Sequence, residues 1–207
     1  MFDANRRDRV IADYDIGLPE SWYQVDLEAA PGVVWARGLA QQLAATASAR
    51  TSLTERLQAV HGSLVRIQDP SMTAAVWIRD PDSGRVDSVL GFRLTDLAEG
   101  QDEETYLAEL AEDDGRIEPG TRYQAVQTWT VPVAAGLAVG AYNLISHTEL
   151  GDEETQLEER TVIGVFPPHS TQFVECIFTA ETPGTYEDII QDTMKIAASI
   201  SVELVKA

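Results

Sequence analysis

The sequence predicts an α+β fold: a central antiparallel sheet of about six to seven strands with helices packed on both faces. Apolar residues recur at helical spacing near the start, the middle and the end of the chain. Between these segments, shorter stretches follow a two-residue period and are separated by turn residues. Because 207 residues give room for one domain, we assign residues 1–207 to a single domain with a helical segment at about 31–67.

The N-terminal third begins with an extended stretch from Ile11 to Leu18, which Pro19 ends. Pro31 suits the first turn of a helix, and the next segment has an apolar stripe at a spacing of four. Its members are Trp35, Leu39 and Leu43. Ser52 and Glu55 have the spacing of a capping box and predict a second helix start. The buried face of that helix is expected to hold Leu53, Leu57, Val60 and Leu64.

The middle of the chain changes from the helical to the strand period. We expect a hairpin formed by strands at 73–79 and 86–95, joined by a turn at Asp82-Ser83-Gly84. Asp102 is expected to cap a short helix that carries Tyr106 and Leu110 on its apolar side. Gly115 supplies the left-handed residue that commonly ends a helix.

The C-terminal half predicts a meander of strands at about 123–131, 139–148, 161–166 and 171–180, with an acidic turn at 151–154. Alternation places the following residues on one face of the first strand: Tyr123, Ala125, Trp129 and Val131. Thr185 is expected to cap a final helix with an apolar stripe that includes Ile189 and Ile196. A last strand at 201–205 follows.

The order of these elements resembles that of the PsbP-like superfamily. The resemblance is carried by Leu18-Pro19-Glu20-Ser21-Trp22, by the short helix at 102–111, and by the closing strand, helix and Ile200-Ser201-Val202 ending. It covers about two thirds of the chain, and the helical stretch at 31–64 is longer than the family pattern. Members of that superfamily mostly bind or scaffold other molecules, so the resemblance implies a fold more directly than an activity.

The charge and the cysteine content restrict the partners and the cellular compartment that we expect. Fifteen basic residues against 34 acidic ones give a formal charge of −19, which excludes a nucleic-acid partner along most of the surface. A lone cysteine, Cys176, indicates no disulfide and favours the cytoplasm. No signal peptide is expected, because the apolar stretch after the N-terminal arginines is only Val10-Ile11-Ala12. No membrane span is expected either, because polar residues, Pro and Gly interrupt the uncharged stretch at 123–148. Thirteen arginines against two lysines favour a GC-rich, actinobacterial genome.

The sequence lacks the common motifs for metal binding, cofactor binding and nucleophilic catalysis. The three histidines have no second ligand at metal-binding spacing: His61, His147 and His169. Neither a nucleophile elbow nor a phosphate-binding glycine loop occurs, so we expect no metal, no cofactor and no enzyme activity. Cys176 is expected to be a buried, inert thiol. Glu175 is expected on an exposed strand face, because carboxylates are seldom buried without partners.

The leading hypothesis is a non-enzymatic protein-binding or adaptor domain. Sheet-face aromatics are its candidate partner-binding residues, and they are Trp22, Tyr123 and Trp129. A basic protein is the partner that complements the acidic surface. One alternative is a carrier of a small apolar ligand in a cavity lined by Trp35, Leu39 and Trp129. Another is an enzyme whose site pairs His147 or His169 with an acid such as Glu175. Oligomeric state and partner identity do not follow from the sequence.

Overall fold

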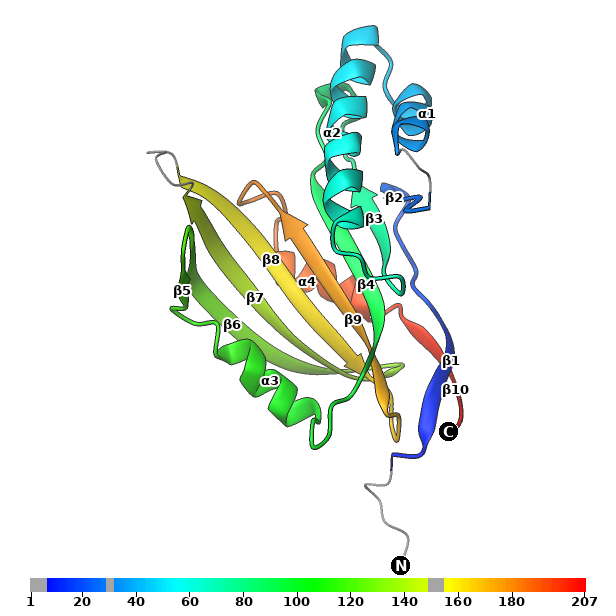
Figure 1. Ribbon diagram of the computed structural model, residues 1–207, viewed down its shortest axis with the longest axis vertical. Helices are drawn as coiled ribbons and strands as arrows, with labels where there is room; N and C mark the ends of the chain where they lie inside the picture. Colours follow the sequence, from blue (N-terminus) through cyan, green and yellow to red (C-terminus); the bar gives the residue numbers. More distant parts are fainter. Residues whose placement is uncertain (1–6, 29–31, 149–154) are drawn as a thin grey trace, which may run out of the picture. The chain divides into compact units, whose positions relative to one another are not determined.

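A computed structural model describes residues 7–28, 32–148 and 155–207 and confirms the α+β class (Figure 1). The main sheet is antiparallel and has eight strands in the order β2-β3-β4-β9-β8-β7-β6-β5, and a second sheet pairs β1 with β10. The main sheet therefore exceeds the six to seven strands predicted. Its two edge strands, β2 (Trp22–Gln24) and β5 (Ile117–Glu118), have three and two residues, which is too short for a visible alternation.

The contacts within the chain divide it into two compact units. Unit 1 consists of Met1–Leu18 and Arg93–Ala207, and unit 2 is the intervening Pro19–Phe92. Strand β4 (Ser88–Asp96) begins in unit 2 and ends in unit 1. The assignment of residues 1–207 to a single domain stays a prediction.

Unit 2 contains the predicted hairpin. Strand β3 (Thr73–Trp77) pairs with β4 on one side and with β2 on the other. A 3₁₀ turn, η1 (Pro81–Ser83), connects β3 to β4 and ends at Gly84, whose φ of 70° lies in the left-handed region that favours glycine. A Cβ at Gly84 would also lie only 2.6 Å from the side chain of Ser52, so the turn packs closely against a helix.

Two helices fill the predicted helical stretch at about 31–67. Helix α1 (Val33–Leu43) buries Ala36 and Ala40 completely, and the predicted stripe of larger residues flanks them and is partly buried. Pro31 lies outside the described residues. Helix α2 (Ala47–Val65) starts earlier than predicted, because the Thr46 side chain accepts the Ala49 N–H and caps it. Ser52 therefore lies inside the helix. The predicted buried face is confirmed for Leu53, Leu57, Val60 and Leu64.

Unit 1 is built on the predicted meander. It runs through β6 (Thr121–Val133), β7 (Gly136–Thr148), β8 (Thr155–Phe166) and β9 (Gln172–Ala180), each antiparallel to the next. The acidic turn predicted at 151–154 lies outside the described residues. Buried residues continue through the middle of β7 on both faces, as expected for a strand covered on both sides.

A β-bulge in β6 changes which of its residues share a face. Tyr123 pairs with Ile145 on β7, but the next paired residue, Ala125, lies opposite Leu144. The extra residue, Gln124, inverts the alternation, because directly paired residues of neighbouring strands point to the same face. The prediction that Tyr123 and Trp129 share a face is therefore wrong.

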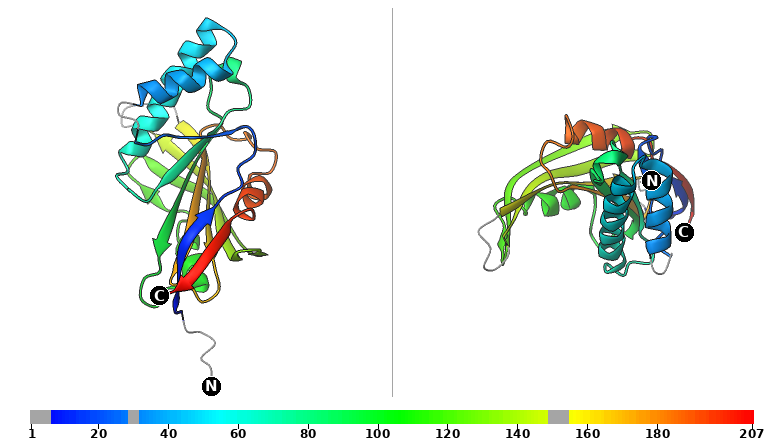
Figure 2. Two further views of the ribbon diagram at one scale, coloured as in Figure 1. Left: turned by 90° about the vertical axis from the view of Figure 1, so that its right-hand side faces the viewer. Right: turned by 90° about the horizontal axis from the view of Figure 1, so that it is seen from above.

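Two helices cover opposite faces of the meander (Figures 1 and 2). Helix α3 (Glu103–Ala111) contacts β6 and β7 on the concave face, and α4 (Ile189–Ala197) contacts β7 and β8 on the other. The Asp102 cap of α3 is confirmed and includes a reciprocal hydrogen bond with Thr105. The Thr185 cap is wrong: Asp188 caps α4, whereas the Thr185 hydroxyl donates to the Thr182 carbonyl. None of the helices in the described ranges has the length and apolar character needed to cross a bilayer.

A two-stranded ribbon completes unit 1. Strand β1 (Arg9–Asp15) pairs antiparallel with β10 (Ser201–Lys206), so the early and the late strands predicted from the sequence are neighbours (Figure 2). Ile11 is buried on one face of the ribbon, whereas Asp13 and Asp15 are exposed on the other. Hydrogen bonds from the backbone of β1 hold the ribbon beside the start of β9.

Candidate functional site

Trp22, the first candidate aromatic, is a core residue of unit 2. Its ring stacks on Trp77 with centroids 6.1 Å apart, and only 8% of its surface is exposed. The guanidinium of Arg79 lies over the Trp77 ring at 4.8 Å, and the Trp77 indole N–H donates to the Ser21 hydroxyl. The two tryptophans thus join the edge strand β2 to β3.

The other two candidate aromatics lie on opposite faces of unit 1. Tyr123 is 6% exposed, and its hydroxyl accepts a 2.7 Å hydrogen bond from Arg116. Trp129 lies across Gly140 of the neighbouring strand, where a Cβ would be 2.6 Å from the indole ring. Its indole N–H is buried and has no hydrogen-bond partner in the part of the chain that the structure describes. These residues do not form one surface, and their role in binding a partner stays a prediction.

Glu175 corrects a second expectation, because its carboxylate is buried rather than exposed. The residue is 8% exposed and lies on the same sheet face as α3. Its Oε1 accepts a 2.9 Å hydrogen bond from the Tyr106 hydroxyl, and its Oε2 accepts a 2.8 Å bond from Nε of Arg93. Both carboxylate oxygens have partners, which explains how an acid is tolerated in this position.

Burial sets the protonation of the groups around Glu175. Desolvation, followed by the negative charge of Glu175, raises the pKa of Tyr106 far above its usual range. Cys176 is fully buried on the opposite face of β9, as predicted, and burial raises the pKa of its thiol to about 12. Near neutral pH these groups are a protonated phenol and a protonated thiol. The cluster is suited to fastening α3 to the sheet.

The histidines are dispersed. His147 Nε2 lies 3.3 Å from Glu158, which also pairs with Arg160, so His147 has an acidic neighbour other than Glu175. His61 is buried in unit 2 and contacts the Asp26 carbonyl at 3.1 Å. His169 is exposed, with a positive φ of 64°. Within residues 7–28, 32–148 and 155–207, no three His, Cys, Asp or Glu side chains gather closely enough to hold a metal ion.

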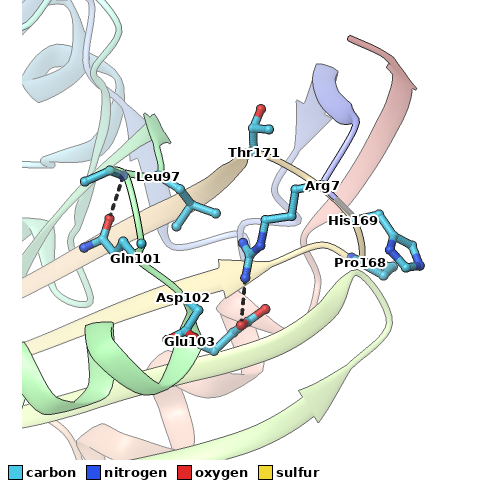
Figure 3. Close-up of a pocket in the computed structure, with 10 residues that line it drawn as sticks. Arg7, Leu97, Gln101, Asp102, Glu103, Pro168, His169 and Thr171 are labelled. Atoms are coloured by element: carbon cyan, nitrogen blue, oxygen red, sulfur yellow. Dashed lines mark hydrogen bonds and ion pairs between the residues drawn. The ribbon is translucent and has the colours of Figure 1, made fainter. Parts of the chain in front are cut away.

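A hollow of about 600 Å³ lies at the start of α3 in unit 1 (Figure 3). Arg7 reaches into it and pairs with Glu103 at 2.9 Å, while Asp102 is engaged in capping α3. Gln101 receives a hydrogen bond from the Ala98 N–H and donates to Glu109. Most charged and amide groups of this hollow therefore already bind one another, which leaves little for a ligand to satisfy.

A larger groove of about 930 Å³ lies in unit 2, beside the C-terminal end of α2. Its apolar lining comes from α1, α2 and the loops that follow β2 and α2, and consists of Val25, Leu27, Trp35, Leu64, Val65, Pro70 and Met72. Three carboxylates, Asp26, Glu28 and Asp69, also line it, whereas its described lining contains no Lys or Arg. This combination of apolar surface and negative charge makes the groove the candidate functional site.

Local sequence holds each side of the groove in place. The Trp35 indole N–H donates to the Gln24 carbonyl at 3.2 Å, so α1 is tied to β2. On the other side, Asp69 accepts hydrogen bonds from the backbone and hydroxyl of Ser71, which shapes the turn before β3. The sequence alone did not reveal this groove. Its only signals were acidic residues beside apolar ones, in Asp26-Leu27-Glu28 and Asp69-Pro70.

Comparisons with known proteins add no assignment: no protein-family model matches this sequence, and no curated protein matches it. The resemblance to the PsbP-like superfamily therefore stays a prediction. The observations that bear on function are the lining of the groove and the charges of the chain itself.

Proposed function

We propose that this protein is a non-enzymatic binding or adaptor module of a bacterial cytoplasm, and that the unit 2 groove docks a basic, amphipathic segment of a partner protein. The observation that carries the proposal is the lining of the groove, which combines an apolar floor with three carboxylates and no described basic residue. The single cysteine and the arginine-rich composition support the cellular setting.

The apolar part of the groove explains affinity. Val65, on its rim, is 47% exposed, and the neighbouring Ile67 is 56% exposed, so a docking segment would cover side chains that now face water. Burial of apolar surface contributes about 25 cal/mol per Å². An amphipathic helix places apolar anchors three and four residues apart, which suits a groove lined by side chains from several elements.

The carboxylates explain the choice of partner. Asp26, Glu28 and Asp69 favour Lys or Arg on the flanks of the docking segment and disfavour nucleic acid or an acidic peptide. The small-ligand alternative rests on a different set of residues: Trp35 lines this groove, whereas Leu39 packs against the core of unit 2. Because Trp35 is common to the groove and to the carrier alternative, binding of a small apolar compound is an alternative outcome of the binding test.

The test uses a synthetic amphipathic helical peptide of leucine and lysine, titrated into the full chain by calorimetry. Val65→Arg places a cation in the groove and is expected to weaken binding about tenfold or more, because it covers apolar surface and repels lysine. Val34→Arg is the matched control. Val34 is 75% exposed in the same unit and does not line the groove, so this variant is expected to bind like the wild type.

Three results would count against the proposal: no binding at low salt, equal weakening by Val65→Arg and Val34→Arg, or equal binding of a peptide with glutamate in place of lysine. Binding of a small apolar dye that Val65→Arg abolishes, without any peptide binding, would favour the carrier alternative instead.

A further inference from the structure

The ribbon of β1 and β10 in unit 1 has one covered edge and one open edge. On the covered side, the Arg9 N–H donates to the His169 carbonyl, and the Thr171 N–H donates to the Arg9 carbonyl at 2.9 Å. The Ile11 N–H donates to the Gln172 side chain, also at 2.9 Å. On the opposite side, β10 pairs with no strand of the described residues, because its sheet contains only β1 and β10.

The hydrogen-bond pattern fixes which backbone groups face outward from β10. The Ala207 N–H donates to the Asp8 carbonyl at 2.9 Å. Since antiparallel strands alternate between hydrogen-bonded and non-hydrogen-bonded pairs, Val205 and Glu203 then direct their backbone groups toward β1. Val202, Leu204 and Lys206 direct their N–H and C=O groups outward, where an additional strand would find them.

One face of the two-stranded ribbon is strongly acidic. Asp13 lies directly opposite Glu203, and Asp15 is the next acid on the same face. None of the three forms an ion pair with a described residue. Like charges on directly paired residues are destabilising, so a cation bound here would relieve repulsion within the ribbon. Beside them, Val205 is 41% exposed, which adds an apolar contact.

We propose that the outer edge of β10 is a second docking surface, which binds an extended basic segment of a partner protein as a third strand. The outward backbone groups would supply the main-chain hydrogen bonds, and alternating side chains of the segment would meet the two faces. Cations on the segment would face Glu203, while Asp13 and Asp15, one strand further in on the same face, add to the negative potential. This surface is distinct from the unit 2 groove and does not depend on it.

The distribution of charge favours a basic occupant over a second copy of the chain. Unit 1 holds 26 of the 34 acidic residues and 9 of the 15 basic ones, whereas unit 2 holds 8 and 6. Two copies that met at this edge would bring two units of high negative charge together, and the repulsion between them would disfavour association. A basic segment would instead be attracted to it, with an association rate that falls as salt rises.

The experiment titrates a synthetic peptide of alternating lysine and valine, about six residues long, into the full chain labelled with ¹⁵N. We expect its largest amide shift changes at Val202, Leu204 and Lys206. The same peptide with N-methyl groups on alternate amides cannot complete the strand ladder. It is expected to bind about tenfold more weakly.

A pair of charge variants tests the acidic face. The double variant Asp13→Asn, Glu203→Gln is expected to bind the unmethylated lysine–valine peptide about fivefold or more weakly than the wild-type protein does at low salt. The matched control is Asp114→Asn, Glu187→Gln, which removes two exposed acids of unit 1 that belong to neither strand of the ribbon and is expected to leave binding unchanged. Val65→Arg in the groove is also expected to leave it unchanged.

The proposal is overturned if the peptide does not bind, if N-methylation leaves its affinity unchanged, or if both double variants weaken it equally. Shift changes confined to the unit 2 groove would also overturn it, while leaving the proposed function intact. Analytical sedimentation tests for a dimer of the chain. A dimer that becomes more stable in the Asp13→Asn, Glu203→Gln variant would identify the occupant of this edge as a second copy and overturn the proposal of a basic segment.

Discussion

The Tyr106 hydroxyl donates a 2.9 Å hydrogen bond to the buried carboxylate of Glu175 and thereby joins α3 to β9. The ring of Tyr106 also packs edge-on against Phe166 and Phe173, whose rings stack with centroids 4.6 Å apart. Gly164 makes room for this cluster, since a Cβ there would lie 3.0 Å from the Tyr106 ring. One residue therefore connects the helix to the sheet by both polar and apolar contacts.

Tyr106→Phe tests the polar part of this connection. The variant keeps the ring but leaves Oε1 of Glu175 without its donor, so we expect the unfolding free energy to fall by about 1–3 kcal/mol. Urea unfolding followed by circular dichroism measures the change. Tyr142→Phe is the control, because the Tyr142 hydroxyl binds Glu159 in a less buried position and its loss is expected to cost under about 1 kcal/mol. Equal losses would contradict the special role of Glu175.

Alkaline pH is expected to destabilise the protein partly through Cys176. Burial raises the pKa of this thiol to about 12, whereas the unfolded thiol keeps an ordinary value near 9.0. Above that value the thiol of the unfolded protein is deprotonated while the buried thiol of the folded protein keeps its proton. The contribution of the thiol to stability is therefore complete below about pH 9 and is lost as pH rises toward 12. Urea unfolding of wild type and Cys176→Ala at pH 7 and pH 10 is the measurement. The wild type should lose more stability than the variant, and parallel losses would refute the assignment.

The contact between Gly140 and Trp129 is expected to be specific. Gly140→Ala places a methyl group against the indole ring and should lower the unfolding free energy by about 1–3 kcal/mol. Combining it with Trp129→Leu, which removes the ring, should recover part of that loss. The double-mutant cycle measures the coupling by urea unfolding. Strictly additive effects would mean that the indole does not lie over Gly140.

Two glycines of unit 2 should respond to alanine in opposite directions. A Cβ at Gly32 would overlap the His61 ring, so Gly32→Ala should displace His61 from the Asp26 carbonyl and destabilise unit 2 by about 1–3 kcal/mol. At Gly38, inside α1, a Cβ would have no neighbouring atom within 4 Å. Gly38→Ala should therefore stabilise the helix by about 0.5–1 kcal/mol. Thermal unfolding measures both changes, and the same sign for both would disprove this packing.

Local patterns in the sequence predicted most of the helices and strands. The stripe that contains Leu53 and Leu57 and the Asp102 cap both follow from residue type and spacing. These features depend on neighbours close in the chain, so they are visible without a tertiary structure. Gly115 has the expected left-handed φ of 70°, but the prediction that it ends the helix is wrong, because α3 ends at Ala111 with Glu112 as its C-cap.

The predictions that are wrong concern features that depend on residues distant in the sequence or on one extra residue in a strand. The bulge at Gln124 leaves the composition of β6 unchanged but inverts the faces of Tyr123 and Trp129. Glu175 was expected in solvent because its partners, Tyr106 and Arg93, come from elements far away in the sequence. The groove in unit 2 was missed for the same reason: segments 24–28 and 64–73 are brought together only by the fold.

The pairing of β1 with β10 has a consequence for the order of folding during synthesis. Unit 2 is continuous in sequence, so its helices and hairpin can form while the rest of the chain is still on the ribosome. The ribbon must wait, because β1 emerges early and its partner emerges after every other described strand. Until then the exposed edge of β1 needs protection from other nascent chains, and the negative charges of Asp8, Asp13 and Asp15 provide repulsion against such mispairing.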